Sequence, residues 1–352
     1  MNIKITGSGS YIPTEVVFNK DFAQHVFMND DGTLFPHAND LVVEKFLEIT
    51  GIHERRYVTD NLNTSDIGYI AAKKAIEDAK VDPETLDYII FAHNFGNVKK
   101  GTIQTDLLPS LATRVKFDLR IQNPKCVCYD MLFGCPGWLE GVIQAQAFIK
   151  AGMAKKCLVI GAETLSRVVD LHDRDSMIYS DGAGATIIEA TEEEGGILTH
   201  ETATFTYDEA FYLFFGNSFN KTHNPDVRYI KMHGRKIYEF ALIQVPKAMK
   251  ECLDKSGVNI NNVKKILIHQ ANEKMDEAII QRFYKLYKLD VPSGIMPMSI
   301  HKLGNSSVAT IPTLYDSLVK GEIENQSLHK GDVILFASVG AGMNVNAIVY
   351  KM

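Results

Sequence analysis

The 352-residue sequence lacks several features that would assign it to a broad class. It has no apolar run approaching the roughly 18 residues of a membrane-spanning helix, and no signal-peptide-like apolar region near its start. It has no dense Lys/Arg tract, and its net charge of -6 argues against a general nucleic-acid-binding protein. We therefore expect a cytoplasmic protein that binds neither membrane nor nucleic acid.

Cysteine is scarce, and none of it is arranged as in a zinc site, so no metal site is expected. Thiols in a reducing compartment are the simplest interpretation of the five cysteines, most of which occur where a small buried hydrophobe is usual. Cys135 differs, because it follows an apolar stretch and precedes Pro136 and the helical periodicity of residues 138–151. With Pro136 at the first helical position, the sequence predicts a thiol at a helix N-terminus, where the helix dipole lowers its pKa.

The chain also repeats itself internally, in three pairs of segments that occur in the same order with similar spacing. The pairs are strands 89–93 and 266–270, the turn-helix-strand segments 134–162 and 304–337, and the glycine turns 182–184 and 340–342. Three ordered matches make chance a poor explanation. They predict duplicated α/β halves, residues 1–190 and 191–352, with mixed, largely parallel sheets covered by helices.

Three reactive side chains fall where such sheets bind ligands, beyond the carboxyl ends of the strands. Cys135 and Asn305 are expected at corresponding strand-to-helix turns, and His269 follows the apolar residues of another strand. Taken singly, they could be a buried thiol, a helix cap and a strand-end histidine. Their ordered coincidence with the duplication instead favours acyl chemistry through a thiol nucleophile.

These residues resemble the thiolase-like condensing enzymes, and within them the β-ketoacyl-acyl-carrier-protein synthase III type. The segments that carry the resemblance span nearly the whole chain: 4–13, 50–56, 109–110, 134–138, 161–167, 173–174, 180–185, 269–272 and 304–307. The turn at 340–342 lacks the second catalytic cysteine of true thiolases, and Asn305 separates the site from that of the two-histidine condensing enzymes.

The resemblance implies a thiolase-like fold, in which duplicated α/β halves form a layered α-β-α-β-α core, and a homodimer. It implies decarboxylative Claisen condensation of an acyl thioester with a malonyl- or β-ketoacyl-carrier thioester, in fatty-acid, polyketide or related lipid biosynthesis. The partners would be acyl carrier protein and an acyl-CoA or acyl-carrier donor, with no cofactor. Two alternatives stay open: a non-decarboxylating acyltransferase that uses the same cysteine, and a non-catalytic partner subunit.

Carried onto this chain, the resemblance makes Cys135 the nucleophile, with His269 and Asn305 as donors to an enolate. The backbone N–H groups of Cys135 and Ala341 would form the oxyanion hole. The expected substrate-binding residues are Arg174, Asn272 and Lys274.

The expected CoA site departs from the family pattern, because Lys45 and Ile49 stand where a Trp and an Arg usually hold the adenine. The only tryptophan, Trp138, lies elsewhere in the sequence. The departure favours another way of carrying the acyl donor, such as a carrier protein. The aromatic segment 205–219 is expected to pack in the core or at a dimer interface, or to line a channel for a long or aromatic acyl chain.

Overall fold

The computed structural model describes residues 1–352 and contains two mixed β-sheets in one layered molecule. The first sheet contains β1 (Asn2–Tyr11), β4 (Tyr88–His93), β7 (Val127–Leu132), β8 (Lys156–Thr164) and β9 (Asp181–Thr191). The second contains β10 (Gly196–Thr204), β13 (Val263–Ile268), β14 (Val333–Gly340) and β15 (Asn344–Lys351). Three small ribbons lie outside them: β2 (Glu15–Phe18) with β3 (Glu54–Tyr57), β5 (Asn97–Val98) with β6 (Thr105–Asp106), and β11 (Leu213–Gly216) with β12 (Tyr229–Met232).

The two sheets repeat one topology. The strand order is β1-β9-β8-β4-β7 in the first and β10-β15-β14-β13 in the second. In each sheet one strand, β9 or β15, pairs antiparallel with both of its neighbours. The glycine turn predicted at 182–184 is wrong, because these residues are part of β9, whereas residues 340–342 do form a turn before β15. The next pair, β8 with β4 or β14 with β13, is parallel. The duplicated architecture predicted from the sequence is therefore confirmed, although the second sheet has no counterpart of β7.

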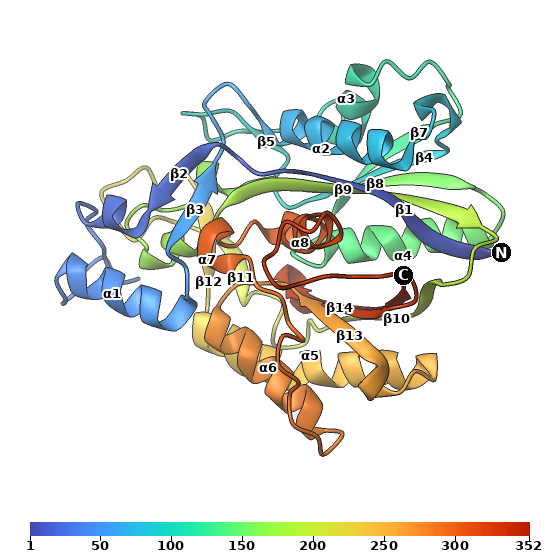
Figure 1. Cartoon of the computed structure of the whole chain (residues 1–352). Coiled ribbons are helices and arrows are strands. Elements are labelled where there is room, and N and C mark those ends of the chain that lie inside the picture. The colour runs from blue at the N-terminus through green and yellow to red at the C-terminus, as the bar shows by residue number, and fades with distance from the viewer.

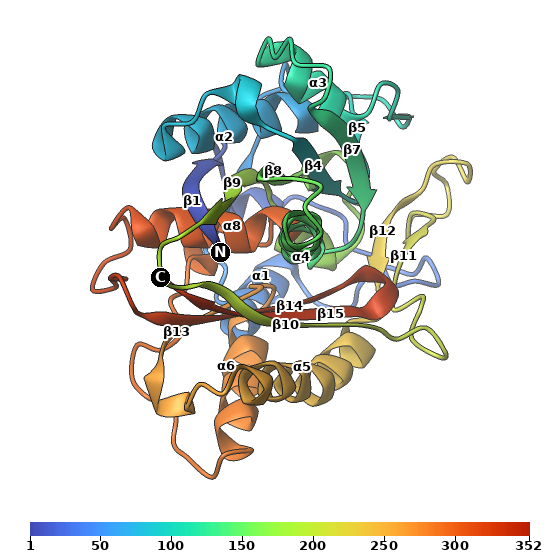
Figure 2. The same ribbon diagram turned by 90° about the vertical axis from the view of Figure 1, so that its right-hand side faces the viewer.

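Most of the α-helices form three layers around these sheets (Figures 1 and 2). The helices are α1 (Asn39–Thr50), α2 (Thr64–Ala79), α3 (Leu111–Asp118), α4 (Gly137–Lys150), α5 (Gly234–Ser256), α6 (Glu273–Lys285), α7 (Ile300–Leu303) and α8 (Thr310–Val319). Of these, α1 and α7 lie to the side of the sheets (Figure 1). Figure 2 shows α2 and α3 on the outer face of the first sheet, α4 and α8 between the sheets, and α5 and α6 on the outer face of the second. Because α8 lies between two sheets, every residue from Thr310 to Leu318 is buried.

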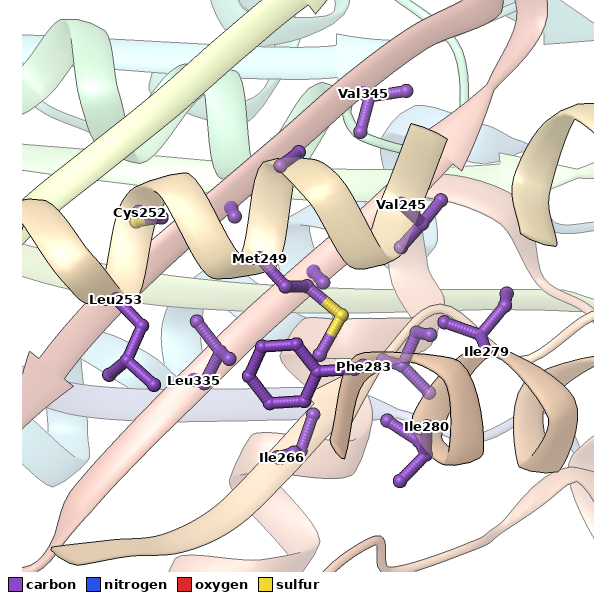
Figure 3. Packing of buried hydrophobic residues seen from close by; sticks show 14 of the residues in the cluster. Val245, Met249, Cys252, Leu253, Ile266, Ile279, Ile280, Phe283, Leu335 and Val345 are labelled. Carbon is purple, nitrogen blue, oxygen red and sulfur yellow. The ribbon is translucent and has the colours of Figure 1, made fainter. Parts of the chain in front are cut away.

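Dense apolar packing fixes these layers. Under the second sheet, Met249 of α5, Phe283 of α6 and Leu335 of β14 meet with no exposed surface (Figure 3). Between the sheets, the Trp138 ring of α4 meets the edge of Phe336 with ring centroids 5.8 Å apart. Removing a buried aromatic ring of this kind typically costs about 3–5 kcal/mol. The helix that follows Cys135 is thus held rigidly against both sheets.

Two local expectations are wrong. Pro136 is the N-cap of α4 rather than its first helical residue, so Cys135 lies in the turn before the helix. Asn305 follows the short helix α7 rather than a strand. Its backbone is instead paired with a segment of the first half: the Asn305 N–H donates to Ile178 O (3.0 Å), and the Ser180 N–H donates to Asn305 O (2.8 Å). These long-range hydrogen bonds, rather than a preceding strand, hold the backbone of Asn305 in place.

All five cysteines are unpaired, and those at positions 126, 157 and 252 are buried, as predicted. Cys128, which was expected to be buried as well, is only partly buried. None of the helices is both long enough and apolar enough to cross a membrane.

Candidate active site

The nucleophile candidate, Cys135, lies in a turn that touches a second turn at the end of β14. An added Cβ at Gly340 would lie 2.5 Å from the Cys135 nitrogen, and one at Gly134 would lie 2.6 Å from the Ala341 nitrogen. Contacts this close leave no room for any side chain, which is why both positions are glycine. The backbone N–H groups of Cys135 and Ala341, predicted as an oxyanion hole, therefore belong to two turns in direct contact.

In the resting protein the side chain of Cys135 is a protonated thiol rather than a thiolate. Burial raises its pKa to about 11, and a hydrogen bond from the Ser307 hydroxyl to Sγ (3.4 Å) opposes that rise. The direction of this pKa shift is opposite to the one expected from the helix N-terminus, because desolvation of the sulfur is the largest contribution and outweighs the hydrogen bonds that lower the pKa. A base close to Cys135 is needed to form the nucleophile.

His269 follows β13 directly, and its backbone N–H donates to Ala337 O of β14 (2.9 Å). Only 4% of the residue is exposed, and burial lowers the pKa of its imidazole to about 4. The ring is therefore neutral near pH 7, able to accept a proton at one nitrogen while the other carries one. Its Nδ1 has no hydrogen-bond partner, so no neighbouring group fixes the tautomer.

Asn305 is oriented by its own turn. Its Oδ1 accepts a hydrogen bond from the Ser307 N–H (2.8 Å), which leaves the amide NH2 group without a partner in the protein. The residue is 5% exposed and lines the same cavity as Cys135 and His269. An amide fixed in this way presents hydrogen-bond donors to whatever occupies the cavity.

The cavity that joins these residues has a volume of about 1020 Å³, and 25 of its 40 lining residues are hydrophobic. Cys135, His269, Asn305 and Ala341 all line it. Three residues of the aromatic segment, at positions 213–215 on β11, line it too, whereas Tyr207 of that segment is 97% exposed. The aromatic segment is thus divided between the cavity wall and the surface.

The three predicted substrate-binding residues differ in position. Arg174 lines the cavity, and its guanidinium lies 4.6 Å from the centroid of the Phe35 ring. Asn272 lines it as well, and caps α6 by accepting a hydrogen bond from the Met275 N–H (3.0 Å). Lys274 is not part of the lining; its side chain is 56% exposed, with Nζ 4.0 Å from Glu48.

The two residues at the expected adenine site, Lys45 and Ile49, both line the cavity. Nζ of Lys45 is paired with Glu48 at 2.6 Å. Trp138 is buried in the core, where Nε1 donates to Thr186 Oγ1 (3.2 Å), so it cannot stack on a ligand. Lys45 and Ile49, which replace the family's Trp and Arg, therefore offer no aromatic face on which an adenine could stack.

Sequence reasoning missed a polar network beneath Cys135. The Ser307 hydroxyl accepts a hydrogen bond from Asn94 Nδ2 (3.0 Å), and the Asn94 backbone N–H donates to Glu163 Oε1 (2.6 Å). Glu163 is 1% exposed at the end of the apolar strand β8, and burial raises its pKa to about 7. The only feature of the sequence that could have pointed to this network is the carboxylate of Glu163 within an apolar strand.

No group of three or more His, Cys, Asp or Glu side chains is placed to hold a metal ion.

Two family models match the chain: 3-oxoacyl-[acyl-carrier-protein] synthase III over residues 129–205, and the C-terminal model of the same enzyme over residues 253–352. The β-ketoacyl-[acyl-carrier-protein] synthase III of Staphylococcus haemolyticus is 30% identical over 352 residues, covering 100% of this chain and 99% of that one. Synthase III 1 of Halalkalibacterium halodurans is 32% identical over 342 residues, covering 96% of this chain and 95% of that one.

Solved structures give the same result. The crystal structure of 3-oxoacyl-[acyl-carrier-protein] synthase III from Aquifex aeolicus has a TM-score of 0.81 at 30% identity, covering 99% of this chain and 100% of that one. Cerulenin-bound OleA from Xanthomonas campestris has a TM-score of 0.81 at 19% identity, covering 100% of this chain and 97% of that one, a likeness of fold alone. The layered thiolase-like fold predicted from the sequence is confirmed.

Proposed function

The chain belongs to the 3-oxoacyl-[acyl-carrier-protein] synthase III family, and on that premise we propose that it condenses an acyl thioester with a malonyl-carrier thioester, with loss of carbon dioxide from the malonyl group. The observation that carries the proposal is the convergence of a thiol, a neutral imidazole and an unpaired amide, Cys135, His269 and Asn305, on one apolar cavity. The product serves fatty-acid, polyketide or related lipid synthesis.

Acylation of Cys135 is the first half-reaction. His269 takes the thiol proton, and the sulfur attacks the thioester carbonyl of the donor. The tetrahedral oxyanion accepts hydrogen bonds from the N–H groups of Cys135 and Ala341, a placement supported by the contact between their turns. The C–S bond of the donor then breaks, and the departing thiolate takes the proton from His269. No cofactor takes part in these steps.

Condensation is the second half-reaction. The thioester oxygen of the malonyl group lies between His269 and the Asn305 amide, the C–C bond to the carboxylate breaks, and an enolate forms with release of carbon dioxide. The enolate carbon attacks the acyl carbonyl on Cys135, and the sulfur leaves. An amide at position 305 suits this step because it donates to the enolate oxygen, whereas a carboxylate would repel it. The free tautomer of His269 supports both of its tasks, accepting a proton first and donating a hydrogen bond later.

The donor is an acyl carrier thioester with an apolar chain. Its delivery by a carrier protein is supported by Lys45 and Ile49, which offer no aromatic face for an adenine. An apolar chain is supported by the cavity volume of about 1020 Å³ and by the stacked rings of Phe95 and Phe215 in its wall, 4.9 Å apart. Arg174 and Asn272 would contact the carrier's pantetheine arm, with Lys274 outside the cavity available to the carrier surface.

A homodimer is supported by the open edge of the first sheet. β7 is the last strand there, with Val127 47% and Leu132 72% exposed. An unpaired apolar edge invites a second strand, and a two-fold axis would pair β7 with its own copy. Sedimentation velocity should therefore give about twice the monomer mass; a single monomeric species would exclude this arrangement.

The unpaired cysteines support a cytoplasmic location.

The test of the function supplies acyl-carrier and malonyl-carrier thioesters together, and measures carbon dioxide release and the mass of the product thioester. We expect a β-ketoacyl-carrier product formed in step with carbon dioxide. Acyl transfer to an added alcohol or amine without carbon dioxide would make the protein an acyltransferase. Absence of both reactions would leave it the role of a partner subunit.

A further inference from the structure

A line of three polar side chains outside the predicted triad ends on the sulfur of Cys135. The Ser307 hydroxyl accepts from Asn94 Nδ2 (3.0 Å) and donates to Cys135 Sγ (3.4 Å). Because a hydroxyl has only one hydrogen, its role as acceptor from Asn94 directs that hydrogen to the sulfur. Asn94 is itself held at two points, since its backbone N–H and Nδ2 both donate to Glu163 Oε1.

The backbone of Ser307 has an unusual conformation for a residue that is not glycine. Its φ of 54° lies in the left-handed region, which is strained for a residue with a side chain. In that conformation the Ser307 N–H reaches Asn305 Oδ1 (2.8 Å) while its Oγ reaches Cys135. A glycine would relieve the strain and lose the hydroxyl. Strain retained beside a reactive group marks a functional constraint.

We propose that Ser307 is a further catalytic residue, whose hydroxyl stabilises the Cys135 thiolate, and that Asn94 and Glu163 are positioning residues that aim it. The inference rests on the proposed function, in which Cys135 is the nucleophile. A hydrogen bond to an anionic sulfur is stronger than one to a neutral thiol. The contact therefore strengthens as the thiolate forms, which is the condition for lowering a barrier rather than merely stabilising the resting enzyme.

Glu163 has two separable effects: its carboxylate oxygen accepts hydrogen bonds from Asn94, and its negative charge acts on Cys135. Its Oε1 fixes Asn94, whereas its negative charge opposes ionisation of Cys135. Glutamine at position 163 keeps an acceptor oxygen and removes the charge, while alanine removes both. The positioning role therefore predicts that Glu163→Gln retains the reactivity of Cys135 and Glu163→Ala loses it.

The experiment measures alkylation of Cys135 by iodoacetamide from pH 6 to 11 on the full chain, with the modified residue identified by peptide mass. Ser307→Ala should lower the rate constant at pH 8 roughly tenfold or more and move the profile to higher pH, the loss expected for a hydrogen bond to a charged group. Ser306→Ala is the matched control, because its hydroxyl contacts only Thr310 Oγ1 (3.4 Å). It should follow the wild type.

A second variant guards against a folding defect in Ser307→Ala. Asn94→Leu leaves Ser307 intact but removes the donor that aims it, and should lower alkylation as Ser307→Ala does. A wild-type pH profile in both variants would overturn the proposal. If the profiles shift but no thioester acylates the wild type, the proposed function and the catalytic role of Ser307 fail, while the stabilisation of the Cys135 thiolate by Ser307 stands.

Discussion

Replacement of Asn305 by aspartate tests the amide that is proposed to stabilise the enolate, because it replaces only the NH2 group of that amide. The two side chains have the same shape, and a carboxylate can still accept the hydrogen bond that the Ser307 N–H donates to Oδ1 (2.8 Å), so the turn should keep its conformation. What disappears is the NH2 group, one of two donors proposed for the enolate oxygen. The residue is 5% exposed, so water cannot readily replace that donor.

The magnitude follows from the loss of one preorganised donor, which typically costs about 2.7–4 kcal/mol, or 10²–10³ in kcat. The new negative charge beside the enolate adds to the loss, so Asn305→Asp should release carbon dioxide from a malonyl thioester at least about 100-fold more slowly. Acylation of Cys135 does not use this amide and should fall by less than about tenfold. As the pH falls and the introduced carboxyl group takes a proton, it becomes a donor, and part of the decarboxylation should return.

The assay follows carbon dioxide release and acyl-enzyme formation separately on the same preparations, with Ser306→Ala as the neighbouring control. Decarboxylation by Asn305→Asp within about threefold of the wild type would refute the role of the amide. A parallel loss of acylation and decarboxylation would show that the substitution damaged the whole site.

Three further predictions concern the turns, the thiol and the cavity wall. Gly340→Ala places a Cβ 2.5 Å from the Cys135 nitrogen and should slow acylation more than tenfold while lowering the free energy of unfolding by about 1–3 kcal/mol; wild-type acylation and thermal stability would contradict the contact between the turns. Because burial raises the pKa of Cys135, alkylation of the wild type should be slow at pH 7 and increase up to about pH 11, and a midpoint at or below pH 7 would contradict a protonated resting thiol. Phe215→Ala, which removes the ring stacked on Phe95, should slow transfer of long acyl chains more than short ones in a competition assay, whereas equal losses would remove this wall from chain selection.

The fold was predictable where its signals are local. Periodicity and glycine turns identified the paired strands, because each half folds its own sheet from the same order of elements. The surroundings of Asn305 were not predictable in this way: its turn pairs with residues 178–180, more than a hundred positions away in the sequence. The first half supplies this contact, and no pattern near position 305 records it.

The candidate site divides in the same way. Cys135, His269 and Asn305 stand in recognisable segments. Glu163 also stands in one, at 161–167, but its link to Cys135 runs through Asn94 and Ser307, and such tertiary contacts leave no pattern in the sequence. The pKa of the thiol was expected to fall, since the sequence reveals the helix that follows but not the depth of burial. Electrostatics of buried groups depends on what surrounds them, and that is decided by the whole fold.

The proposed mechanism depends most directly on whether Cys135 carries the acyl group. Intact-protein mass of the wild type, Cys135→Ala and Cys128→Ser should be measured after incubation with a panel of acyl-carrier and acyl-CoA thioesters. We expect one added acyl group on the wild type and on Cys128→Ser, mapped to the peptide that contains Cys135, and none on Cys135→Ala. Equal acylation of Cys135→Ala, or a wild type that no thioester acylates, would contradict it.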